Sequence, residues 1–166
     1  MKPSTLKRHI IATLLLASGL LAGCATPPRP GDFLIAPVRT GRIALQVQQE
    51  PTPQSFIAGF ELSGNAENGQ LRLLSPFGSV LATARWTPGH AVLLHNGNER
   101  SFRSLDALLE TLTGAPLPGA ALLDWMDGRN TAAAGWEADL SQYQQGKIRA
   151  QRLQPPPLAT LQVVLQ

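Results

Sequence analysis

The sequence lacks most of the features that catalysis, metal binding or disulfide bonding would require. Cys24 is its only cysteine, so no disulfide can form within the chain. It has neither a Gly-Xaa-Ser-Xaa-Gly elbow nor a phosphate-binding loop. His90 and His95 do not stand at metal-ligand spacing with any Cys, Asp or Glu. We therefore expect a protein that is not an enzyme and that holds no cofactor and no metal.

The chain also lacks a basic cluster. It has 14 Lys and Arg against 11 Asp and Glu, and Lys2, Lys7 and Arg8 account for the whole excess. A protein without a basic patch has no electrostatic footprint for nucleic acid, so we exclude nucleic acid as a partner. The basic residues near the C-terminus read as the solvated face of a strand: Lys147, Arg149 and Arg152.

No apolar run is long enough to cross a bilayer. The run from Ile10 to Leu21 follows the basic residues of the first eight positions, and small residues then lead to Cys24. This is the layout of a secretory signal peptide, which we assign to residues 1–23. An ordinary cleaved signal with an incidental cysteine is the simpler alternative to a lipidated one.

The ending Leu21-Ala22-Gly23-Cys24 resembles the lipobox of bacterial lipoproteins. The resemblance implies that the Cys24 sulfur receives a diacylglycerol and that the new amino group is acylated, for example with palmitate. One acyl chain binds a membrane only marginally, so three should anchor the protein almost permanently. Ala25 stands where lipoproteins retained in the inner membrane carry Asp. The resemblance therefore implies an outer-membrane anchor with the domain facing the periplasm.

Residues 24–38 are predicted to be the lipidated cysteine and a proline-rich tether. Prolines 27, 28, 30 and 37 resist helix and favour an extended chain. At about 3.1 Å per residue, such a tether reaches roughly 40 Å. One domain, residues 39–166, follows it and is long enough for a sizeable core.

Apolar residues alternate with polar ones over most of this domain, which predicts antiparallel strands with short connections. Ile43, Leu45 and Val47 form one such face, and Val80 shares another with Ala82. Gly59 inside a strand suggests a bend or bulge, and Asn96-Gly97 predicts a tight hairpin. The predicted strands cover residues 42–48, 56–63, 71–73, 80–86, 91–95, 100–103, 136–142, 147–154 and 158–165.

The period changes to that of a helix after Ser104. Ser104 can cap a helix over residues 105–112, and Gly114 ends it. A second short helix is predicted over residues 120–126, with Asp124 and Asp127 on its solvated side rather than as an acid–base pair. The fold class is therefore mostly β (α+β): a curved antiparallel sheet with a helical insert over its concave face. Periodicity leaves open whether the helices fill a core or cover a cavity.

Four stretches carry a resemblance to a known family: the lipobox, residues 41–45 (GRIAL), residues 73–79 (LLSPFGS) and residues 104–128. The last contains LTGAPLP and LDWMDG. In this order they resemble the LolB family of outer-membrane lipoprotein receptors. The resemblance implies an unclosed antiparallel half-barrel with a helical lid over an apolar cavity. It also implies a receptor that accepts lipoproteins from the periplasmic carrier LolA and inserts them into the outer membrane.

The partners implied are a LolA-type carrier, the acyl chains of cargo lipoproteins and outer-membrane lipid, and we expect a monomer. The alternatives are a structural or assembly lipoprotein that uses the same half-barrel without acyl cargo, and an anchored hydrolase. The candidate cavity residues are apolar side chains of the two helices and the strands below them, although these would equally fill a dry core. They are Phe56, Phe60, Trp86, Leu105, Leu108, Leu109, Leu112, Leu122, Trp125 and Met126.

Phe77 is a large apolar residue at the tip of a turn that should be polar. It lies between Pro76 and Gly78, and an exposed apolar side chain at a loop tip is typical of contact with a partner or a membrane. In the LolB family the corresponding residue is a projecting leucine that promotes membrane insertion of the cargo. The resemblance implies the same role for the Pro76–Gly78 loop. The alternative is that the ring folds back onto the end of the sheet.

Overall fold

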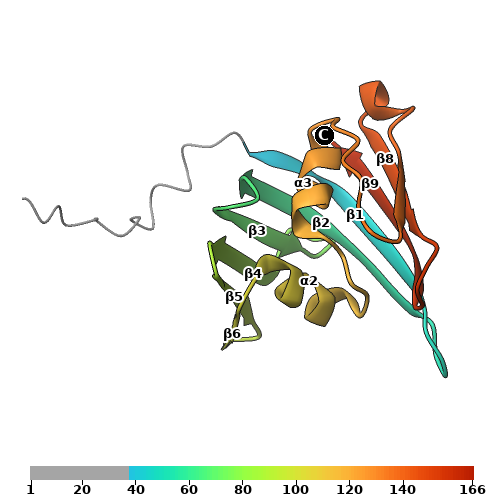
Figure 1. Cartoon of the computed structure of the whole chain (residues 1–166). Coiled ribbons are helices and arrows are strands. Elements are labelled where there is room, and N and C mark those ends of the chain that lie inside the picture. The colour runs from blue at the N-terminus through green and yellow to red at the C-terminus, as the bar shows by residue number, and fades with distance from the viewer. Residues whose placement is uncertain (1–37) are drawn as a thin grey trace, which may run out of the picture. The chain divides into compact units, whose positions relative to one another are not determined.

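The computed structural model describes residues 38–166, so the predicted signal peptide, Cys24 and all of the tether except Val38 lie outside the described residues. The sheet has nine strands in the order β6-β5-β4-β3-β2-β1-β9-β8-β7, every neighbour antiparallel. It curves around two short helices without closing (Figure 1). The strands are β1 (Arg39–Gln48), β2 (Gln54–Gly64), β3 (Gly69–Leu74), β4 (Val80–Thr87), β5 (His90–His95), β6 (Asn98–Phe102), β7 (Trp136–Asp139), β8 (Lys147–Arg152) and β9 (Leu158–Leu165).

The predicted fold class is confirmed, and its local causes are those expected. On β1, Ile43, Leu45 and Val47 are buried against the helices while the alternate residues face solvent. The β5–β6 turn has two residues, Asn96 and Gly97, both with positive φ (51° and 75°). That conformation matches the twist of the flanking strands, which is why Asn-Gly favours it.

The helices α2 (Leu105–Thr113) and α3 (Gly119–Met126) lie over the concave face of the sheet (Figure 1). The Ser104 hydroxyl accepts a hydrogen bond from the Ala107 N–H at 3.1 Å, and Gly114 ends α2 in the left-handed conformation with φ 73°. Both ends of α2 therefore lie where the sequence predicted them. The core is the apolar layer between these helices and the inward residues of the strands.

The prediction that Val80 shares the inward face of β4 is wrong. Pairing between β3 and β4 shifts register between Leu73 and Leu74, so that Ala82 pairs with Leu73 while Val80 pairs with Leu74. A bulge of this kind reverses the side-chain alternation beyond it. Val80 is consequently 47% exposed. The pairings of Gly59 show no shift, so the irregularity of this part of the sheet is in β3–β4 instead.

Two further differences occur near the C-terminus. The strand expected over residues 136–142 ends at Asp139, because the Asp139 carboxylate accepts the Ser141 N–H at 2.9 Å and turns the chain into a short 3-10 helix, η3 (Tyr143–Gln145). Arg152 was expected on a solvated face with Lys147 and Arg149, but its side chain is on the opposite, inward face of β8 and only 5% of the residue is exposed.

Candidate functional site

An apolar seam lies between the sheet and the two helices. Six of the ten predicted cavity residues line it: Phe60, Trp86, Leu105, Leu109, Leu122 and Met126. Ile43, Leu62, Leu71 and Leu123 complete its apolar wall, together with Gly119. The free space in the seam is about 20 Å³. That is enough for one water molecule and far below what an acyl chain occupies.

The four other predicted cavity residues pack outside the seam. Leu108 and Trp125 are fully buried, while Phe56 and Leu112 are half-buried against the core. The Trp125 indole N–H donates to the Thr131 carbonyl at 2.9 Å, which fixes the ring. In this closed form the helices therefore fill the concave face as a core, and only a movement of a helix would open room for a ligand.

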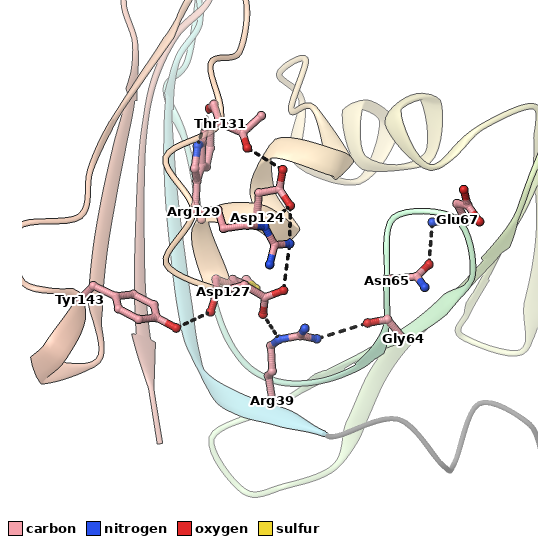
Figure 2. Close-up of polar contacts among 11 residues, drawn as sticks. Arg39, Gly64, Asn65, Glu67, Asp124, Asp127, Arg129, Thr131 and Tyr143 are labelled. Carbon is pink, nitrogen blue, oxygen red and sulfur yellow. Dashed lines mark hydrogen bonds and ion pairs between the residues drawn. The ribbon is translucent and has the colours of Figure 1, made fainter.

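A polar network holds the C-terminal end of α3 to the start of β1 (Figure 2). The Arg39 Nε donates to the Asp127 Oδ1 at 2.5 Å, and its Nη1 donates to the Gly64 carbonyl at 3.3 Å. Arg39 and Asp127 are 88 positions apart in the chain, and each side chain is about one-fifth exposed. This contact is the one charged link between α3 and the sheet within the described residues.

Arg129 extends the network along α3. Its guanidinium pairs with Asp124 and lies 3.1 Å from the Asp127 Oδ2. The Thr131 hydroxyl donates to Asp124 at 2.5 Å. That hydrogen bond, and then the Arg129 guanidinium, hold the pKa of Asp124 below its ordinary value. Asp124 and Asp127 were predicted to be simply the solvated side of α3, whereas both carboxylates are half-buried in this network. Because Arg39 is distant in sequence, no local pattern indicated the link.

The turn that presents Phe77 is rigid. The Gly78 N–H donates to the Ser75 carbonyl at 2.9 Å, and the Ser75 hydroxyl accepts the N–H groups of Phe77 and Ser79 at 3.3 and 3.1 Å. Pro76 restricts φ in the same turn, and Gly78 takes a φ of 81° that few other residues adopt. Phe77 is 97% exposed, so its ring does not fold back onto the sheet.

Phe77 does not stand alone at this corner. Val80 and Leu81, 47% and 41% exposed, follow it directly at the start of β4. The register shift between β3 and β4 turns Val80 outward, and the sequence pattern had placed it in the core. The three side chains form an exposed apolar corner: Phe77, Val80 and Leu81.

Within residues 38–166, no group of His, Cys, Asp and Glu is placed to hold a metal ion, and His90 and His95 are both exposed. The same part of the chain contains no helix with the length and hydrophobicity needed to cross a membrane.

The half-barrel, its helical cover and its apolar seam define a structural class, an unclosed antiparallel sheet with two helices over an apolar layer. The family model described as outer membrane lipoprotein LolB matches residues 38–157. The outer-membrane lipoprotein LolB of Bordetella pertussis is 33% identical, covering 79% of this chain and 77% of its own length. Its counterpart in Bordetella petrii is 32% identical over 84% and 85% of the two chains. The chain belongs to the LolB family of outer-membrane lipoproteins.

Membership in this family confirms the main functional prediction. The protein is a lipoprotein receptor of the outer membrane, faces the periplasm and accepts lipoproteins from LolA, and it is not an enzyme. The family favours this function over a structural or assembly lipoprotein without acyl cargo, and over an anchored hydrolase.

Proposed function

We propose that the two helices open to admit the acyl chains of the cargo into the apolar seam, and that the Phe77 corner then passes the cargo to outer-membrane lipid. The observation that supports this most is the seam itself, since its wall is entirely apolar and lies beneath two short helices. In this proposal Cys24 carries the acyl anchor, residues 24–38 are the tether, and the protein acts as a monomer.

The charged link between α3 and the sheet does not prevent such an opening. Each buried methylene contributes about 0.8 kcal/mol, so roughly ten methylenes of an acyl chain contribute about 8 kcal/mol. The Arg39–Asp127 link is partly exposed, and a pair of this kind contributes about 1 kcal/mol or less. Cargo can therefore displace the charged link, and the helices close again when the chains leave.

The release step uses a different part of the molecule. A rigid turn holds an aromatic ring almost wholly in solvent, where it costs free energy unless an apolar phase receives it. Val80 and Leu81 enlarge the same apolar corner. A ring and two aliphatic side chains that enter the acyl region would bring the opened seam close to the bilayer.

The experiment that tests this function is transfer of a radiolabelled lipoprotein from LolA to outer-membrane vesicles, with and without the protein. We expect label to appear in the vesicles only when the protein is present, and an apolar dye to compete with cargo for the seam. Normal transfer together with no dye uptake and no competition would contradict a role for the seam.

A further inference from the structure

A second hollow, which we call the Arg152 hollow, has no part in the function proposed above. It has a volume of about 310 Å³ and lies between α2, the α2–α3 connection, the segment before β7, the end of β8 and the segment that follows β8. Its wall contains two carboxylates, one guanidinium and several apolar rings: Asp106, Glu110, Pro116, Pro118, Arg152 and Pro155.

Arg152 is a buried cation without an anionic partner among residues 38–166. Only 5% of it is exposed, and no carboxylate of these residues lies within 4.0 Å of it. Its Nη1 donates to the Gln154 carbonyl at 3.5 Å, the limit of a hydrogen bond, and its Nε has no partner in this part of the chain. Burial of an uncompensated charge is unfavourable. Because Arg152 lines the hollow, an anion bound there would compensate this charge.

The carboxylates of the hollow belong to one face of α2. Asp106 and Glu110 are four positions apart, so they lie one turn from each other. The Asp106 Oδ1 accepts the Gly119 N–H at 2.8 Å, which fixes that side chain, whereas Glu110 has no ion pair within residues 38–166. A ligand that pairs with the guanidinium and with both carboxylates must carry an anionic group for Arg152 and a cationic group for Asp106 and Glu110.

The hollow and the apolar seam are lined by neighbouring residues at the beginning of both helices. Leu105 lines the seam and Asp106 the hollow, while Gly119 lines the seam and Pro118 the hollow. Leu105 and Asp106 both pack against Gly119, so the two spaces are separate while the helices are closed. When the helices open as proposed above, a molecule with acyl chains in the seam would place its polar head in the hollow. This proximity favours a lipid over a peptide, since a peptide of similar charge would leave the seam empty.

We propose that the Arg152 hollow binds the phosphoethanolamine head group of a phospholipid. The phosphate accepts hydrogen bonds from the Arg152 guanidinium, which suits phosphate geometry, and the ammonium donates to Glu110 and Asp106. This inference rests on the proposed function, because the acyl chains of the phospholipid occupy the same seam as those of the cargo.

Calorimetry with short-chain lipids tests the proposal on the unlipidated Cys24→Ala protein. We expect dihexanoyl phosphatidylethanolamine to bind about tenfold more tightly than dihexanoyl phosphatidylglycerol, which has no ammonium, or dihexanoylglycerol, which has no head group. Arg152→Gln should lower the affinity for phosphatidylethanolamine about tenfold, equivalent to about 1.4 kcal/mol, and leave dihexanoylglycerol binding unchanged. Its Tm should stay equal or rise, because an unpaired buried charge is removed.

Two further variants allow the proposal to be tested if Arg152→Gln folds poorly. Glu110→Gln changes an exposed side chain and should reduce the preference for phosphatidylethanolamine over phosphatidylglycerol. Arg149→Gln, on the outer face of the same strand, is the matched control and should change nothing.

Several results would overturn the inference. They are equal binding of phosphatidylethanolamine and dihexanoylglycerol, unchanged affinity in Arg152→Gln, and a free O-phosphoethanolamine affinity as high as that of the lipid. Binding of a Lys-Asp dipeptide but not of the phospholipid would assign the hollow to a polypeptide instead. Failure of dihexanoylglycerol to bind would count against the seam and so against the proposed function, which separates the two failures.

Discussion

Phe77→Glu should separate insertion of the cargo from the stability of the fold. The ring is 97% exposed, and substitutions at such positions usually change the free energy of unfolding by about 0.5 kcal/mol or less. The turn itself is held by Ser75, Pro76 and Gly78, which the substitution leaves in place. We therefore expect an unchanged Tm.

The expected effect on insertion follows from the burial of the ring. Full transfer of a Phe side chain out of water contributes about 1.5–3 kcal/mol. Its loss should slow insertion by about 10- to 150-fold, and the carboxylate adds a further penalty for entering the acyl region. Uptake of cargo from LolA should continue at the normal rate, because that step uses the seam.

The assay follows a radiolabelled lipoprotein first from LolA to the protein and then from the protein to liposomes. Leu153→Glu is the matched control, since Leu153 is 50% exposed directly after β8, which β9, β1 and β2 separate from β3 in the sheet. Phe77→Leu should retain most of the activity. A Phe77→Glu protein that unfolds readily, or one that inserts cargo as fast as Leu153→Glu, would refute the reasoning.

Four further predictions concern the anchor, the network and the seam. Cys24→Ala should abolish partitioning into membranes, and an unmodified Cys24 in the mass spectrum of membrane-extracted protein would contradict lipidation. Arg39→Ala or Asp127→Asn should lower the free energy of unfolding by about 1 kcal/mol or less and raise uptake of an apolar dye. The reversed pair, Arg39→Asp with Asp127→Arg, should restore both values only in part, because a guanidinium at position 127 faces Arg129. Leu109→Ala should cost about 2–5 kcal/mol and increase dye binding by enlarging the seam; unchanged dye binding would show that the seam is inaccessible. Because the pKa of Asp124 is lower in the folded chain than its ordinary 3.8, its stabilising contribution is complete above that value and is lost as the pH falls through the folded-state pKa. Asp124→Asn should remove this part of the pH dependence of the free energy of unfolding, measured by denaturant titration. If the free energy of unfolding falls as steeply at acidic pH in the variant as in the unsubstituted protein, the Asp124 carboxylate is not the source of that dependence.

Much of the fold could be predicted because its causes are local. The alternation on β1, the Asn96-Gly97 turn and the Ser104 cap each depend on residues within a few positions of one another. Hydrogen bonding and steric effects over such short distances leave few alternatives. The order of β1 to β6 and of β7 to β9 was also accessible, since short connections favour neighbouring antiparallel strands. The pairing of β1 with β9 was not, because it joins the first strand to the last.

The candidate site was predicted only in outline. Phe60, Leu109 and Met126 line the apolar seam, but periodicity cannot distinguish a filled core from a cavity. Both require the same apolar faces, and the difference is a matter of how side-chain volumes fit together.

The sequence by itself determined the local elements, the apolar faces and the position of Phe77 at the tip of a turn. The tertiary structure alone decided that the Phe77 ring is exposed and that Val80 joins it at the surface, since the latter depends on a one-residue shift between two strands. It also decided that Arg39 meets Asp127 and that Arg152 is buried without an anion from residues 38–166. Each of these features depends on contacts or register between segments, and a charged residue has the same local sequence pattern whether its partner is water, a carboxylate or a ligand.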